Sequence, residues 1–117
     1  MQTDEQRRND FIAYLKQLKQ TWVIEKDAER VIIRSILSHT DSELATYIAH
    51  FKRMVGKMES GIDMQTDKYS KNPPADGKCV DSFVGANVTT QDYTSNYSLR
   101  LFFSETGKKI YKFEVLC

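Results

Sequence analysis

The residues of this sequence best suited to chemistry are two histidines and two cysteines, His39, His50, Cys79 and Cys117. A cysteine thiolate that a histidine activates and a carboxylate orients is a common nucleophile, and Cys79 with His50 and Asp81 could supply one. No glycine-rich turn and no local pattern that lowers a thiol pKa accompanies Cys79. We therefore interpret His50 as a residue on the flank of a helix and His39 as a polar residue at a helix junction.

The sequence contains no recognisable metal or nucleotide motif. Neither cysteine belongs to a Cys-x-x-Cys pair, which is the spacing of many zinc and thioredoxin-like sites. Asp63 and Asp67 lack the spacing of a calcium loop, and the common phosphate-binding and hydrolase motifs are absent. We predict no catalytic residue, no metal ligand and no cofactor, and we interpret the chain as a protein that is not an enzyme.

The two cysteines leave two interpretations open. They are either unrelated thiols or a disulfide between Cys79, at the start of the β region, and Cys117, the last residue. A disulfide would stabilise the fold by ~3–4 kcal/mol, although in a flat three-stranded meander these two positions lie at opposite ends. A pair of cysteines is typical of exported proteins. The N-terminus shows no apolar signal segment, and we favour an exported or periplasmic location, with the cytoplasm as the alternative.

Length and composition are those of one folded domain. A chain of 117 residues has the size of a common domain, and we expect residues 1–117 to form a single one. Six phenylalanines, six tyrosines and one tryptophan provide bulk for a core. The net charge of +1 argues against nucleic-acid binding driven by bulk charge, and the chain has no apolar run of about 18 residues that would predict a transmembrane helix.

The first part of the chain, residues 3–60, is helical in pattern. Thr3 and Gln6 have the spacing of a capping box, which predicts the start of a helix. A second apolar set over residues 28–36 predicts another helix or a kinked continuation of the first, although Val31–Ile33 leaves a strand possible. We favour a helix, because charged residues such as Arg30, Arg34 and Glu29 provide it with a solvated face. The apolar stripe of the first helix comprises Phe11, Leu15, Leu18 and Trp22.

The strongest helical pattern follows next. Thr40 and Glu43 predict a second capping box, and Gly61 is a natural helix end. One face of this predicted helix is apolar, and we interpret it as core. Its members are Leu44, Tyr47, Ile48, Phe51, Val55 and Met58.

A long polar loop over residues 61–78 separates the helical part from a β part over residues 79–117. Alternating patterns predict strands over residues 79–88, 97–103 and 109–117. In the last strand the alternation places Tyr111, Phe113 and Val115 on one face and Ile110 on the other. The predicted class is α+β, with two or three N-terminal helices on a C-terminal antiparallel meander of about three strands.

The order of helices followed by an antiparallel meander resembles the cystatin-like fold of nuclear-transport-factor-like domains. The segment LRLFFSETGKKIYKFEV over residues 99–115 is similar to their closing strand pair, in which a Gly-Lys-aromatic turn enters the last strand. The resemblance implies a curled sheet. It leaves function open, because such domains include binding modules, exported proteins, isomerases and dehydratases. Tyr111 stands where those domains usually carry a tryptophan, and their Asp/His catalytic pair has no counterpart here.

Two functions are compatible with this reading. The first is a non-enzymatic protein-binding module, such as an inhibitor or immunity-type protein that blocks a partner protein, and a homodimer is compatible with it. Aromatic and arginine side chains are the usual anchors of such interfaces. The candidate anchors are Tyr69, Tyr93, Tyr97, Arg100 and Lys109.

The alternative function is binding of a small ligand, with or without catalysis, in a pocket between the helices and the concave face of the sheet. His50 or Asp81 would supply polarity to that pocket. The competing interpretation is that the same side chains simply fill the core. The lining residues would be Tyr47, Tyr97, Leu99 and Phe113.

Overall fold

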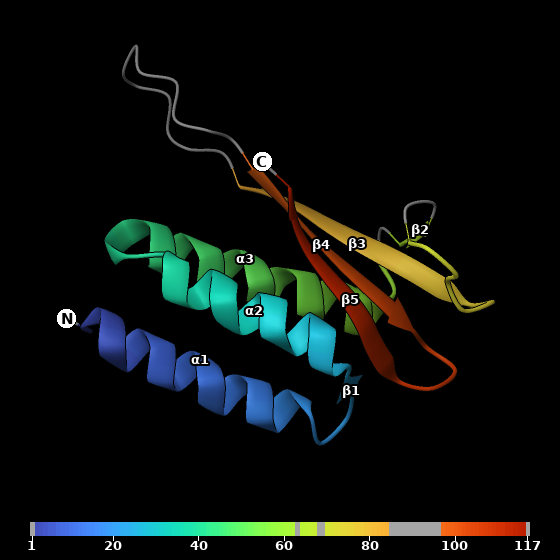
Figure 1. Cartoon of the computed structure of the whole chain (residues 1–117), viewed down its shortest axis with the longest axis horizontal. Helices are drawn as coiled ribbons and strands as arrows, with labels where there is room; N and C mark the ends of the chain where they lie inside the picture. Colours follow the sequence, from blue (N-terminus) through green and yellow to red (C-terminus); the bar gives the residue numbers. More distant parts are fainter. Residues whose placement is uncertain (1, 63, 68–69, 85–96, 117) are drawn as a thin grey trace, which may run out of the picture.

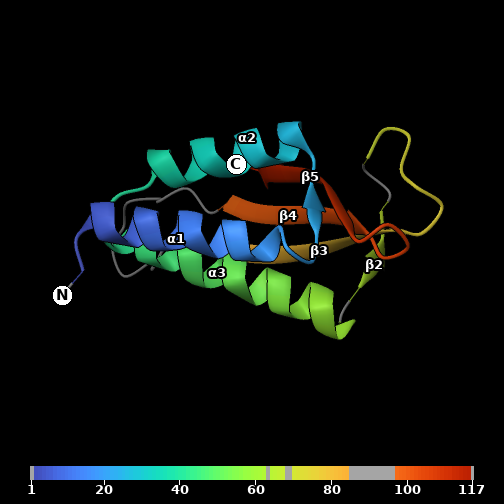
Figure 2. The ribbon, with the colours of Figure 1, turned by 90° about the horizontal axis from the view of Figure 1, so that it is seen from below.

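In the computed structural model, which describes residues 2–62, 64–67, 70–84 and 97–116, three helices precede the three long strands of a sheet. The helices α1 (Asp4–Leu18), α2 (Lys26–Ser38) and α3 (Asp41–Ser60) all lie on one side of that sheet (Figure 1). Figure 1 shows α1 beneath α2 and α3, on their side away from the strands, and in the view from below α1 lies between them (Figure 2). The α+β class is therefore confirmed, with α2 and α3 as the layer in contact with the sheet.

Of the three helix ends predicted from the sequence, two are confirmed. The Thr3–Gln6 capping box is present, with the Thr3 hydroxyl accepting from the Gln6 amide and the Gln6 side chain accepting from the Thr3 amide. Gly61 ends α3 in the left-handed conformation, with φ of 72°. Residues 31–33 belong to α2, so the helical interpretation of this apolar set is confirmed.

The predicted Thr40–Glu43 capping box is wrong. Thr40 is the N-cap of α3, but its side chain makes no capping hydrogen bond. Only two residues connect α2 to α3, and Asp41 enters the helix with a φ of 52°. The Asp41 amide instead donates to the Asp4 carboxylate over 3.0 Å. A tertiary contact with the first turn of α1 thus satisfies one of the free amides at the start of α3.

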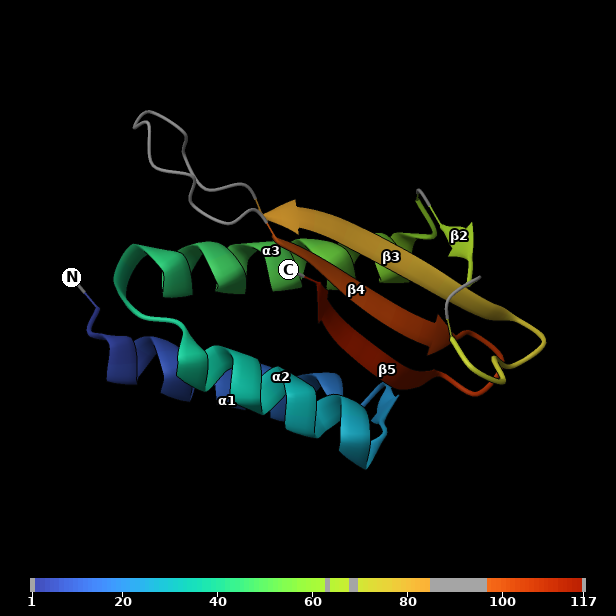
Figure 3. The same ribbon diagram turned by 45° about the horizontal axis from the view of Figure 1, so that its top comes forward.

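The sheet contains the predicted antiparallel meander and two further strands. The meander consists of β3 (Gly77–Val84), β4 (Tyr97–Ser104) and β5 (Lys109–Leu116), and Figure 3 shows the three side by side. The expected count of about three strands is wrong, because β1 (Val23–Ile24) pairs in parallel with β5 and β2 (Gln65–Thr66) pairs with β3. The described sheet is therefore mixed, in the order β1-β5-β4-β3-β2.

The extra strands have no sequence signal because each is two residues long. A period-two pattern needs four or more residues to be recognised. β1 exists because the Val23 amide donates to the Lys108 carbonyl and the Glu25 amide donates to the Ile110 carbonyl. The predicted strand over residues 79–88 begins at Gly77 instead, and its residues 85–88 lie outside the described residues.

A β-bulge changes the faces of β5. Phe102 pairs with Lys112 while Phe103 pairs with Ile110, so Tyr111 is an extra residue in its strand. Ile110 and Phe113 are consequently both buried in the core, whereas the Tyr111 ring contacts Phe102 on the opposite face at 6.1 Å between centroids. The predicted grouping of Tyr111 with Phe113 is wrong for this reason, since simple alternation fails at a bulge.

One hydrophobic core lies between the helices and the sheet. The predicted stripes of the first and third helices are buried there, and Ile48 is partly buried at its edge. Aromatic rings from different elements meet in it: Phe11 contacts Phe51 and Phe51 contacts Phe113. Within the described residues, no helix has the length and apolarity needed to cross a membrane.

Candidate interaction surface

The three predicted anchors within the described residues lie at separate places in the sheet. Tyr69 and Tyr93 lie outside the described residues. Tyr97 is packed against the core on the helix side of β4, whereas Arg100 pairs with Asp81 across strands at 3.2 Å. Lys109 lies at the hairpin end of β5, and its ammonium group is 2.5 Å from the Glu25 carboxylate.

Tyr97 belongs to a structural network with His39. The buried His39 ring has Nδ1 2.6 Å from the Ser35 carbonyl and Nε2 2.7 Å from the Tyr97 hydroxyl. A carbonyl accepts only, so Nδ1 carries a proton and, in the neutral ring, Nε2 accepts from the tyrosine. Arg8 donates to the His39 carbonyl at 2.6 Å. The network attaches the α2–α3 junction to β4 and α1, which agrees with the junction role inferred for His39.

The Cys79, His50 and Asp81 constellation is not assembled. His50 Nδ1 lies 2.5 Å from the hydroxyl of Ser82, which points to the helix side of β3. Cys79 and Asp81 alternate with Ser82 and therefore face the other side. Burial, and then the Asp81 charge, raises the pKa of Cys79 to about 12. A thiol held protonated in this way is a poor nucleophile.

Cys79 makes a weak hydrogen bond, in which its thiol donates to the Asp81 carboxylate at 3.4 Å. Cys117 lies outside the described residues, so a Cys79–Cys117 disulfide stays a prediction. Among the described residues, no three His, Cys, Asp or Glu side chains are grouped closely enough to hold a metal ion.

The residues expected to line a ligand pocket are packed together instead. Tyr47, Leu99 and Phe113 are almost fully buried in the core, and Tyr97 is bonded to His39. Burial also holds the pKa of Tyr47 well above its usual value. Small-ligand binding between the helices and the sheet stays a prediction, and neither of the two hollows described next lies in this place.

Two hollows lined by described residues lie on the helical surface. The smaller, of about 300 Å³, lies between α1 and α3 and is lined by Gln2, Arg7, Asp10, Phe11, Ala45, Ile48 and Lys52. The larger, of about 480 Å³, lies on the outer side of α2. We call this second hollow and its lining the α2 surface; it comprises Lys26, Glu29, Arg30, Ile33, Arg34 and Leu37.

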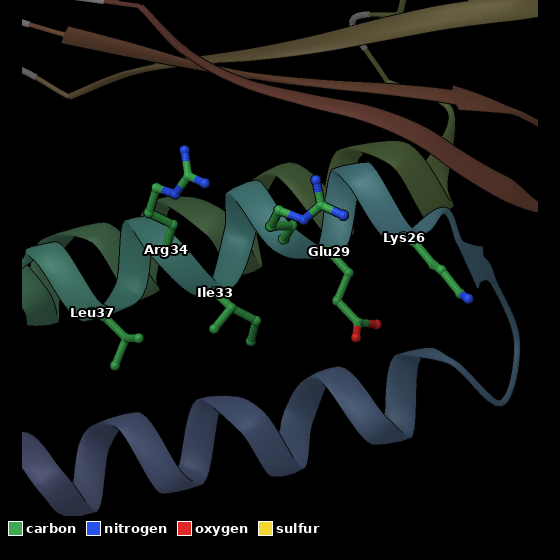
Figure 4. Close-up of a pocket in the computed structure, with 6 residues that line it drawn as sticks. Lys26, Glu29, Ile33, Arg34 and Leu37 are labelled. Carbon is green, nitrogen blue, oxygen red and sulfur yellow. The ribbon is translucent and has the colours of Figure 1, made fainter.

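The α2 surface consists of two rows of side chains. Lys26, Arg30 and Arg34 are spaced four residues apart and form a basic row, because side chains at this spacing are neighbours on a helix. Ile33 and Leu37 form the apolar part of a parallel row that begins at Glu29. Figure 4 shows Arg34 on one side of the helix and Ile33 and Leu37 on the other.

The α2 surface carries both charged groups without ion pairs among the described residues and exposed apolar area. Glu29 pairs with Lys19, and Arg30 pairs at 3.5 Å with Asp27. Lys26 and Arg34 make no ion pair with any described residue. Leu37 is 60% exposed beside them, so an apolar side chain lies next to the basic row on the same helix surface.

Sequence reasoning missed this surface because Arg30 and Arg34 were interpreted simply as a solvated face. The core stripe of α2 comprises Ala28, Ile32 and Ile36, together with Ser35. Ile33, which is partly buried against the edge of the core, and the exposed Leu37 lie one position further along the helix than Ile32 and Ile36. Two apolar residues at a spacing of four, outside the core stripe and next to arginines, are the signal that could have indicated the surface.

Comparisons with known protein families, curated proteins and solved structures give no match for this chain. The resemblance to nuclear-transport-factor-like domains therefore stays a prediction, and the function is argued from geometry.

Proposed function

We propose that this protein is a protein-binding module and that the α2 surface contacts its partner. Binding there would cover part of the partner's own surface, which is how an inhibitor or immunity-type protein acts. The single observation that carries the proposal is an exposed Leu37 beside Lys26 and Arg34, two cations that pair with no described residue, around one hollow.

This combination has the composition of a binding surface. Interfaces place apolar side chains at the centre and charged groups at the rim, and arginine is among the most frequent energetic anchors. Arg34 and Lys26 line the hollow with positive charge, while Ile33 and Leu37 provide its apolar side. A partner with carboxylates beside an apolar patch would pair both parts of the surface.

Site-specific photo-cross-linking tests the proposal in the organism that makes the protein. The variant Leu37→p-benzoylphenylalanine places the cross-linker on the α2 surface. Ile62 is a matched control position, because it is also apolar and is 58% exposed against 60% for Leu37. We expect ultraviolet light to produce one discrete adduct from position 37 that position 62 does not produce.

The identified protein must then bind in purified form. We expect Arg34→Glu to weaken that binding and higher salt to do the same, because exposed charge pairs are screened. Absence of an adduct at position 37, or identical adducts from both positions, would contradict the proposal. An adduct of two copies of this chain would also contradict it and would favour a homodimer.

A further inference from the structure

We infer that the partner element seated on the α2 surface is an amphipathic α-helix with an acidic row beside an apolar row. This inference rests on the proposed function and adds the chemistry and shape of the partner. It commits to a helix of another protein, rather than to a strand, a nucleic acid or a second copy of this chain.

The shape of the surface favours a helix. Rows of side chains spaced four residues apart form ridges, and the groove between two such ridges accepts a ridge of another helix. On α2 the ridges are Lys26–Arg30–Arg34 and Glu29–Ile33–Leu37, and the hollow of about 480 Å³ lies between them. When both helices use ridges of this spacing, their axes cross at about −50°.

The charges favour an acidic partner. The basic ridge carries three cations, and among the described residues only Arg30 has an acidic partner, the exposed Asp27. Glu29 in the other ridge is already neutralised by Lys19. Two copies of this surface would face each other with like charges and repel, whereas glutamates on a partner helix would lie opposite Arg30 and Arg34.

The apolar part excludes a purely electrostatic partner. Leu37 and Ile33 gain nothing from a phosphate backbone, but they can pack against leucines of a helix. α2 has 13 residues, so it is about 20 Å long. One helix crossing it buries less than the roughly 800 Å² per partner of a stable interface, and we expect an isolated partner helix to bind weakly.

Fluorescence anisotropy with defined peptides tests the inference on the full chain. The probe is a labelled helical peptide of about 18 alanine, leucine and glutamate residues, with leucines in one ridge and glutamates in the next. One comparison peptide has lysines in place of the glutamates, and another has the probe's composition with two central prolines that break the helix. We expect binding of the probe to be at least about tenfold tighter than binding of either comparison peptide.

Two pairs of substitutions locate the binding. Arg30→Gln with Arg34→Gln removes two charges from the α2 surface, and Arg53→Gln with Lys57→Gln removes two from α3 at the same spacing. We expect the α2 pair to weaken binding roughly fivefold and the α3 pair to change it little. Leu37→Ala should also weaken binding, and circular dichroism checks that each variant keeps its helices.

Four results would overturn the inference: no binding of the probe, equal binding of the proline peptide, equal effects of the two charge pairs, or tighter binding of a single-stranded oligothymidine. If the probe peptide does not bind while position 37 still cross-links to a partner protein, the partner contacts the α2 surface with something other than a helix. In that case the proposed function stands and only the helix is wrong.

Discussion

Asp76 accepts three hydrogen bonds from the hairpin between β4 and β5. The donors are the Ser104 hydroxyl and the Thr106 amide, each at 2.6 Å, and the Thr106 hydroxyl. Asp67, which comes earlier in the same loop, also binds the sheet, since its carboxylate accepts a hydrogen bond from the Tyr111 hydroxyl at 2.7 Å. At the scale of single residues, two carboxylates therefore attach the described part of the polar loop to the sheet.

The substitution Asp76→Asn should lower the stability of the protein in a pH-dependent way. Hydrogen bonds from Ser104 and Thr106 hold the pKa of Asp76 well below its ordinary value of 3.8. A carboxylate with a lowered folded-state pKa stabilises the fold above its unfolded pKa and loses that effect as the pH falls towards the folded value. We expect the urea midpoint of the variant to be lower at pH 7 and the difference from wild type to shrink below pH 3.8.

Asp27→Asn is the control for this experiment. Its side chain is 89% exposed and its only described ion pair is with Arg30, so neutralising it should change stability little. A midpoint for Asp76→Asn equal to that of the control at pH 7 would show that the loop attachment contributes nothing measurable.

Two glycines show how the same substitution acts on different elements. Gly77 begins β3, and a Cβ there would lie 2.9 Å from the Tyr111 hydroxyl and 3.0 Å from the Pro74 carbonyl. Gly56 lies inside α3, where a Cβ would meet nothing within 4 Å. The first position needs glycine for close approach, whereas the second only weakens its helix.

Alanine at the two positions should therefore change stability in opposite directions. We expect Gly77→Ala to destabilise by about 1–3 kcal/mol, because the loop carbonyl or Tyr111 must move. Gly56→Ala should stabilise by roughly 0.5–1 kcal/mol through its helix propensity. Urea unfolding of both variants measures the two signs, and a stabilising Gly77→Ala would mean that the entry to β3 is not closely packed.

The whole molecule depends on contacts between its helical and β parts. Leu99 lies in the central strand of the meander and is fully buried, and Trp22 at the end of the helical region contacts Phe103 of the sheet at 5.7 Å between centroids. Neither part can bury its apolar face without the other. We therefore expect the two parts to unfold together.

Leu99→Ala tests this unity. Removal of a fully buried leucine lowers the free energy of unfolding by about 2–5 kcal/mol. We expect the unfolding midpoint to fall by the same amount whether it is followed by Trp22 fluorescence or by far-ultraviolet circular dichroism. Trp22 is the only tryptophan, so its emission reports on the helix–sheet contact alone. Two separate transitions would mean that the parts are independent and that a single domain is the wrong description.

Features that depend on neighbours along the chain follow from the amino-acid sequence alone. The Thr3–Gln6 cap, the helix end at Gly61 and the buried face of the third helix all follow from spacings of three and four residues. These features could be predicted because their donors, acceptors and apolar stripes lie within one or two turns of each other.

Features whose partners are distant in sequence depend instead on how the whole chain packs. The amide of Asp41 takes its acceptor from Asp4, β1 takes its hydrogen bonds from β5, and the bulge at Tyr111 reverses a face that alternation had assigned. The α2 surface belongs to the same group. Whether an apolar residue such as Leu37 is buried or exposed depends on which elements cover its helix, and that choice is made by packing across the whole chain.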